Sequence, residues 1–229
     1  MSEAHAGRSA LAHQFEDIDQ QHETDTLGIW VFLVTEIMFF GGLFASYTIY
    51  RSFYLPAFEA GSRLLNIRLG AINTMILLSS SFTMAMAVRS AQMAKRNALM
   101  VFLVLTMTLG VAFLGVKGIE YHAEYVERII PGVDFVPNFP PGETLQRLFT
   151  GGLAHVQLFM CFYFLMTLVH AVHMTIGLGL LLVLLVRARR GTFTSQYCAP
   201  VEVTGLYWHF VDVVWIFLFP LLYLIGGRY

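Results

Sequence analysis

Long apolar stretches dominate the chain, and short polar segments separate them. Each stretch has about the 20 residues that a helix needs to cross a hydrocarbon core about 30 Å thick. The stretches cover residues 27–49, 69–88, 98–117, 156–186 and 203–225. None shows the strict alternation of a barrel strand, and lipid offers no partners to an open backbone. The pattern therefore predicts five membrane-spanning helices.

Composition agrees with this pattern. Hydrophobic residues make up 57% of the 229 residues and charged residues 13%, and the mean hydropathy is +0.65. A water-soluble domain of this size does not need so apolar a composition. We expect an all-α membrane protein whose five transmembrane helices form a bundle over residues 27–229. The fourth stretch is longer than a span requires, so its helix should tilt or begin outside the bilayer.

Two polar segments lie outside the predicted spans. Residues 1–26 form a polar N-terminal tail with scattered acids, which is neither a signal peptide nor a span. Residues 118–155 form a long proline-rich loop. Its first part, through about Arg128, can continue the third helix beyond the membrane, whereas four prolines forbid regular helix in the middle. They are Pro131, Pro137, Pro140 and Pro141.

Charge gives the orientation and excludes some functions. Basic residues cluster in two short connections, residues 89–96 and 187–190, and short loops with Lys and Arg stay in the cytoplasm. We therefore expect a cytoplasmic N-terminus. A net charge of −1 gives no support to nucleic acid as a partner. No phosphate-binding glycine loop occurs, and the two cysteines have no disulfide or metal spacing.

Glu36 is the most unusual residue of the first span. It lies roughly 14 Å along the helix from Leu27, near the bilayer midplane. A lone carboxylate there should be protonated or hydrogen-bonded, because desolvation disfavours its charged form. Two interpretations remain open: a neutral tether between helices, or an acid that carries protons or senses lipid.

Two histidines share a face of the fourth span. His170 and His173 are one turn apart, a spacing that could contribute to a metal site. Such a site needs further ligands, the HExxH pattern is missing, and His209 is the only other histidine within a span. We therefore expect no metal site, and we interpret the histidines as structural or as contacts to lipid headgroups.

The last span contains the sequence YWHFVDVVWIFLF, which places a histidine and an acid in an apolar segment. Glu202, His209 and Asp212 fall roughly on one helix face, and Trp208 and Trp215 bracket them. A pair of His209 with Asp212 could satisfy both groups in part. We expect it where helices meet or where lipid headgroups reach down, and Pro220 to kink the far end of the helix.

These residues resemble a known family. YWHFVDVVWIFLF closely resembles the C-terminal signature of subunit III of haem–copper cytochrome c oxidases. Four further segments resemble that family's preceding helices in the family's order. They are FLVTEIMFFGGLFAS, INTMILLSSSF, TLGVAFLGVKGIEY and FYFLMTLVHAVHMTIG. Together they cover nearly the whole chain apart from the tail and the proline-rich loop.

The resemblance implies an accessory subunit III of a bacterial aa3-type cytochrome c oxidase in the plasma membrane. Such a subunit packs directly on catalytic subunit I, in a complex with subunit II and further respiratory-complex subunits, binds phospholipid and supports proton uptake. Haem and copper belong to the partner subunits, so no cofactor is expected in this chain. Glu36 matches the family's buried, carbodiimide-reactive glutamate. The other matched positions imply structural or lipid-contacting roles, and they are His170, His173, Glu202, Trp208, His209 and Asp212.

Several features depart from the family's pattern. The longer family form has two more spans, and this chain has Tyr197 and Cys198 where many relatives have paired histidines. Leu168 and Ala171 replace glycines around His170, and the proline-rich loop is longer than usual. Subunit III of a quinol oxidase and an accessory protein of nitric oxide reductase remain alternatives within the fold. A proton-coupled transporter is an alternative from a different class.

Overall fold

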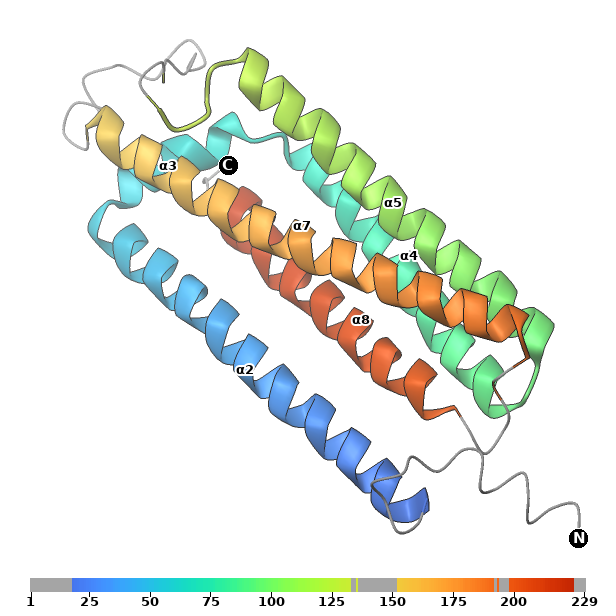
Figure 1. Ribbon diagram of the computed structural model, residues 1–229. Helices are drawn as coiled ribbons and strands as arrows, with labels where there is room; N and C mark the ends of the chain where they lie inside the picture. The colour runs from blue at the N-terminus through green and yellow to red at the C-terminus, as the bar shows by residue number, and fades with distance from the viewer. Residues whose placement is uncertain (1–17, 133–134, 136–151, 192, 194–197, 225–229) are drawn as a thin grey trace, which may run out of the picture.

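The computed structural model describes residues 18–132, 135, 152–191, 193 and 198–224, and its regular elements are all helices (Figure 1). In chain order they are α2 (Ile18–Phe53), α3 (Leu55–Leu64), α4 (Ile67–Gln92), α5 (Arg96–Val126), α7 (Leu153–Arg189), α8 (Ala199–Phe219) and the π-helix η1 (Pro220–Leu224). Five of them are long and apolar enough to cross a membrane, η1 completing the span of α8. The prediction of a five-helix membrane bundle is confirmed.

The helices extend beyond the predicted spans. α2 begins at Ile18, within the predicted tail, and α5 continues to Val126. The ten-residue helix α3 has no counterpart in the sequence analysis. It begins with a proline in its first turn, where the missing N–H costs nothing, and half of its residues are buried. The middle of the proline-rich loop, residues 133–134 and 136–151, lies outside the described residues.

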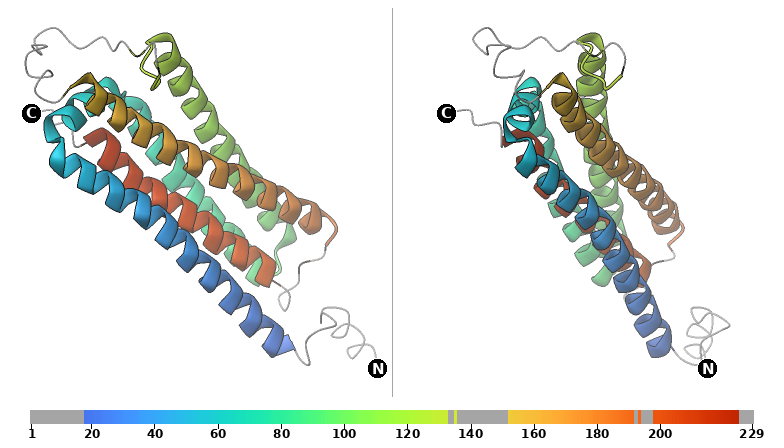
Figure 2. Two further views of the ribbon diagram at one scale, coloured as in Figure 1. Left: turned by 60° about the vertical axis from the view of Figure 1, so that its left-hand side comes forward. Right: turned by 90° about the vertical axis from the view of Figure 1, so that its left-hand side faces the viewer.

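Four of the long helices pack into a continuous bundle, and α2 lies at its edge. α4 contacts α5 and α8, α7 contacts α5 and α8, and α2 contacts mainly α8. The two views in Figure 2 show α2 along one side of the bundle. Only 17% of the most apolar window of α2 is buried, whereas half of the corresponding window of α8 is buried. α8 is therefore central, and α2 presents most of its surface to the surroundings.

Two glycines let the central tryptophan of α8 approach its neighbours. Trp208 is fully buried. A Cβ atom on Gly110 of α5 would lie 2.8 Å from its ring, and a Cβ atom on Gly177 of α7 would lie 3.0 Å away. Small residues at helix contacts allow this close approach, which matters in lipid because van der Waals packing is a main attraction between helices.

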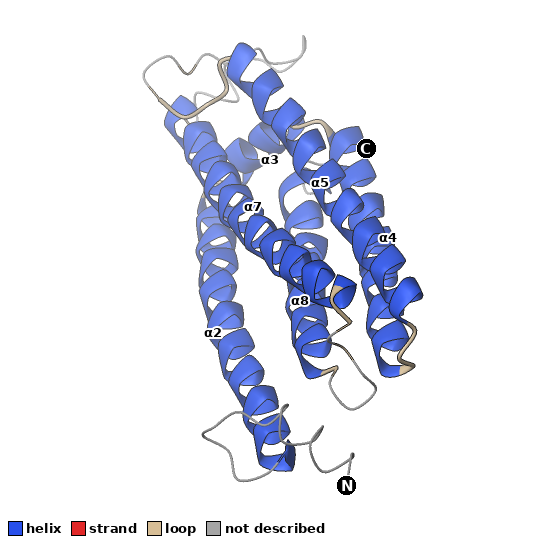
Figure 3. Ribbon diagram, turned by 45° about the vertical axis from the view of Figure 1, so that its right-hand side comes forward, coloured by secondary structure: helices blue, strands red, loops and turns tan. Residues whose placement is uncertain are grey.

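Short connections join α3 to α4 and α4 to α5 (Figure 3). Asn66 caps α4, because its side-chain oxygen accepts hydrogen bonds from the N–H groups of Arg68 and Leu69. Between α4 and α5, Ala94 adopts a positive φ of 53°. At the other end of the molecule, Pro220 ends the α-helical part of α8, and η1 follows. That π-helix brings the buried Tyr223 into the bundle.

Candidate functional site

Glu36 and His173 form a pair that links the edge helix to the bundle. The Oε2 atom of Glu36 on α2 lies 3.0 Å from Nε2 of His173 on α7. The two side chains keep 19% and 14% of their surface exposed, so neither is fully enclosed. A hydrogen bond between α2 and α7 is the geometry of a tether, and it places both polar groups against protein rather than lipid.

The hydrogen bonds of His173 fix how many protons this pair holds. Nδ1 lies 2.8 Å from the carbonyl oxygen of Val169, and a carbonyl can only accept, so Nδ1 carries a hydrogen. The contact between Nε2 and Glu36 then needs one further proton. Either the Glu36 carboxyl donates it to a neutral imidazole, or an imidazolium donates it to a carboxylate. The pair can therefore hold a proton and shift it between two atoms without breaking the tether.

A groove runs past this pair between α2, α7 and α8. It has a volume of about 360 Å³, and aliphatic and aromatic side chains form most of its walls. The hydroxyl of Tyr207 donates to the carbonyl oxygen of His173 at 3.0 Å, which holds the α8 wall against α7. An apolar groove with one polar pair in it suits a hydrocarbon chain better than a charged substrate.

His170 lies deeper in the bundle than His173. It is 1% exposed, and neither ring nitrogen has a hydrogen-bond partner. Its ring packs against Phe113 and Trp215, with centroids 5.5 and 5.2 Å apart. Among the described residues, no group of three or more His, Cys, Asp or Glu side chains is placed to hold a metal ion.

The polar residues of α8 make contacts that differ from the expected ones. Nδ1 of His209 lies 2.7 Å from the hydroxyl oxygen of Ser81 on α4. Asp212 is buried, and neither carboxyl oxygen has a hydrogen-bond partner. The expected pair of His209 with Asp212 is therefore wrong, because the imidazole contacts the hydroxyl of Ser81 on α4 instead.

Two further matched residues also attach α8 to α4. Nε1 of Trp208 donates to the hydroxyl of Ser80 at 3.0 Å within the core. Nearer the start of α8, the carboxylate of Glu202 accepts from the side-chain amide of Gln92 at 2.8 Å. Both contacts join these two neighbouring helices, so these side chains hold α8 against α4.

A second polar cluster, around Lys117, was missed by the sequence analysis. The buried ammonium group of Lys117 donates to Oε2 of Glu120 at 2.9 Å and to the hydroxyls of Tyr163 and Tyr223 at 3.0 and 3.1 Å. These three bonds use all three hydrogens of an ammonium group. We call Lys117, Glu120, Glu124, Tyr163 and Tyr223 the lysine cluster.

The tyrosines pass the hydrogen bonds on to carboxylates. Tyr163 donates to Oε1 of Glu124 at 2.6 Å, and Tyr223 donates to Oε1 of Glu120 at 2.7 Å. The cluster thus joins α5, α7 and η1. The sequence analysis ended the third span at Lys117 and assigned the two acids to the loop. Their spacing of three and seven residues from Lys117 puts all three on one helix face, which was the available signal.

Comparison with known proteins gives a consistent result. The family model described as "Cytochrome c oxidase subunit III" matches residues 18–129 and 153–227. "Probable quinol oxidase subunit 3" of Staphylococcus haemolyticus is 31% identical, over 96% of this chain and 99% of its own length. "Cytochrome c oxidase subunit 3" of Alkalihalophilus pseudofirmus is 34% identical, over 87% and 86%, and that of Thermostichus vulcanus is 30% identical, over 91% and 92%.

Proposed function

The chain belongs to the cytochrome c oxidase subunit III family, and from this premise we propose that it is the accessory subunit III of a bacterial aa3-type cytochrome c oxidase. Family membership makes it an integral membrane protein and part of a respiratory oxidase complex, in which it associates with other oxidase subunits. The observation that carries the proposal is the family match over nearly all of the membrane-spanning part.

In this proposal the chain has no redox centre of its own. Haem and copper belong to partner subunits, and electrons pass through those subunits alone. The intramembrane histidines are engaged within this protein in ways that suit this role: His173 pairs with Glu36, His209 with Ser81, and His170 packs between aromatic rings.

The proposed contribution of the chain is to stabilise the complex and its proton supply. It packs on catalytic subunit I, in a complex that also contains subunit II, and holds phospholipid along its exposed apolar faces. The Glu36–His173 pair keeps an exchangeable proton near the bilayer midplane, where an acid can support proton uptake by the neighbouring subunit. The chain lies in the bacterial plasma membrane with its N-terminus in the cytoplasm, consistent with the basic short loops.

Subunit III of a quinol oxidase is the second candidate. It is favoured by the relatives of that name, including "Quinol oxidase subunit 3" of Bacillus spizizenii, which is 30% identical over 91% of this chain. The electron donor binds to other subunits, so both candidates use this chain in the same way. Family membership favours either over a nitric oxide reductase accessory protein or a proton-coupled transporter.

Purification from the native membrane in mild detergent tests these proposals together. We expect the chain to co-purify with a haem–copper subunit I and with a copper-binding subunit II that accepts electrons from cytochrome c. Quinol oxidation by a complex whose subunit II lacks copper would favour the second candidate. Isolation of the chain alone, with substrate flux after reconstitution, would contradict both and support a transporter.

A further inference from the structure

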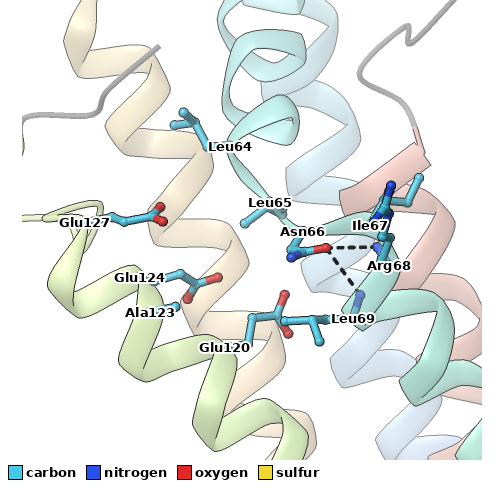
Figure 4. A pocket seen from close by; sticks show the side chains of 10 residues that line it. All are labelled: Leu64, Leu65, Asn66, Ile67, Arg68, Leu69, Glu120, Ala123, Glu124 and Glu127. Atoms are coloured by element: carbon cyan, nitrogen blue, oxygen red, sulfur yellow. Dashed lines mark hydrogen bonds between the residues drawn. The ribbon is translucent and has the colours of Figure 1, made fainter. Parts of the chain in front are cut away.

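A pocket opens beside the lysine cluster, between the corner that joins α3 to α4 and the last turns of α5 (Figure 4). Its volume is about 420 Å³, within the range of about 300–1,000 Å³ that small-molecule sites occupy. Residues 64–69 form one wall, and three acids one turn apart, Glu120, Glu124 and Glu127, line the other. This pocket is distinct from the groove beside Glu36.

The three carboxylates differ in how well the protein satisfies them. Both oxygens of Glu120 have partners within the lysine cluster. Glu124 is 5% exposed, and only its Oε1 has a partner, the hydroxyl of Tyr163. Its Oε2 has none, and the carboxylate points toward the wall formed by residues 64–69 (Figure 4). A buried carboxylate oxygen without a donor is costly, so this atom is suited to a donor that enters from the pocket.

The opposite wall carries a positive charge. Arg68 is exposed at the start of α4 and belongs to the wall opposite the three carboxylates (Figure 4). The N–H groups of Arg68 and Leu69 are already occupied by the Asn66 cap. The guanidinium of Arg68 is therefore the group of this wall that can bind an anion, and its planar set of donors suits a phosphate.

The pocket also lies near the ends of two candidate membrane spans. With 31 residues, α5 is about 46 Å long at 1.5 Å per residue, longer than a hydrocarbon core of about 30 Å. The pocket joins the last two turns of α5 to the first residues of the α4 span. Both positions are ends of membrane-spanning helices, so a ligand with an acyl chain can reach the pocket from the bilayer.

We propose that this pocket binds a phosphoethanolamine group, with its primary ammonium donating to Glu124 and Glu127 and its phosphate on Arg68. The ligand must supply an N–H, which a primary ammonium has and a trimethylammonium lacks. It must also be slim, because Oε2 of Glu124 is buried. An aminophospholipid headgroup and free phosphoethanolamine share this chemistry. The inference rests on the lipid-holding role in the proposed function, and it names the site and the headgroup.

Native mass spectrometry of the intact, delipidated oxidase complex tests this. Short-chain phosphatidylethanolamine, phosphatidylcholine and phosphatidylglycerol are titrated separately, and adducts are counted on the released chain. We expect phosphatidylethanolamine to bind best. Glu124→Gln keeps an acceptor for Tyr163 but removes the charge, and it should weaken this binding roughly ten- to a hundredfold, the loss of one charge-assisted hydrogen bond. Glu127→Gln, at the exposed rim, should act in the same direction without a risk to folding.

Glu59→Gln on α3 is the matched control, because it removes a carboxylate at the same end of the bundle outside the pocket; it should leave binding unchanged. If soluble phosphoethanolamine displaces phosphatidylethanolamine at equal concentration, this result would support the site and identify its ligand as a soluble compound. Equal binding of the three lipids, or unchanged binding in both pocket variants, would overturn the inference. Failure of the chain to co-purify with an oxidase would instead contradict the proposed function, so the two failures are distinguishable.

Discussion

The Glu36–His173 pair and the lysine cluster place charged groups in the same apolar bundle in two different ways. The pair joins the edge helix α2 to α7, and both of its side chains remain partly exposed beside a groove. The lysine cluster joins α5, α7 and η1, and the side chains of Lys117 and Glu120 are only 5% and 3% exposed. The pair has two members joined by one hydrogen bond, whereas the ammonium group of the cluster uses all three of its hydrogens.

This difference assigns different roles to the two sites. A partly exposed pair can exchange its proton while the fold stays intact, because little depends on its exact charge state. A buried ammonium group with every hydrogen bonded stabilises the fold only while its partners are present, since the loss of one leaves another charge uncompensated. The predictions below test this contrast, beginning with the largest expected effect.

Replacement of Lys117 by methionine should be the most damaging change. It leaves Glu120 buried without its cation, and breaking a buried pair in this way costs about 3–5 kcal/mol. We expect little folded chain in the membrane, measured as the yield of complex after mild detergent extraction. Lys95→Met, at the exposed turn between α4 and α5, is the control and should be near neutral. Adding Glu120→Gln to Lys117→Met should recover part of the yield. A normal yield from the single variant would contradict the role of the cluster.

Two glycines of α5 lie on different faces of the helix. Gly110 is on the buried face, which also carries Lys117, and Gly115 is on the exposed face. In Gly110→Ala the new methyl group would meet the ring of Trp208 at 2.8 Å, and overpacking of this kind costs about 1–3 kcal/mol. In Gly115→Ala nothing lies within 4 Å, so a gain of up to about 1 kcal/mol in helix propensity should remain. Thermal unfolding of the purified complex measures both. Equal midpoints for the two variants would show that this face is loosely packed.

Glu36→Gln should have a small effect on stability. A glutamine side chain can still donate to or accept from His173, so the hydrogen bond between α2 and α7 survives and the change should stay below about 1 kcal/mol. Assembly and the initial rate of oxygen reduction should be nearly intact in an oxygen-uptake assay. Because the shared proton is lost, fewer turnovers before inactivation are expected. A complete loss of initial turnover would rule out a tethering role.

The smallest expected effect concerns Cys198, just before α8. The neighbouring carboxylate of Glu202 has neither a buried cation, as in the lysine cluster, nor a shared proton, as in the Glu36–His173 pair. Burial, with a further contribution from the hydrogen bond to Glu202, raises the pKa of the Cys198 thiol. Because the reactive thiolate is disfavoured, alkylation should be slow near neutral pH. Glu202→Gln should lower that pKa and speed alkylation by up to about tenfold at fixed pH, because a larger fraction of the thiol is then ionised. The alkylation rates of Cys198 are followed by mass spectrometry in a Cys161→Ser background. Unchanged rates would show that Glu202 does not influence the thiol.

The sequence was sufficient for the number of spanning helices, because 20-residue apolar stretches leave few alternatives in lipid. It was also sufficient to single out Glu36, since a lone acid in the middle of such a stretch stands out. It did not reveal the partner of Glu36. His173 is 137 positions away, and only the packing of α2 against the bundle brings the two together.

The lysine cluster was missed for a different reason. Lys117 lies at the end of an apolar stretch, where a lysine normally reaches into the headgroup region, and Glu120 and Glu124 looked like loop residues. In the structure α5 continues as a helix and its inner face stays covered by α7 and η1. The expected pair of His209 with Asp212 failed because helix spacing alone does not show that Ser81 of α4 lies within reach of the imidazole.

The central claim is that this chain supports an oxidase whose redox centres lie in its partners. The most direct measurement is oxygen reduction by the purified complex before and after selective removal of this chain, with haem spectra recorded on both. We expect unchanged haem spectra and a near-normal initial rate, followed by fewer turnovers before inactivation. Loss of a haem or of copper together with the chain would contradict the account.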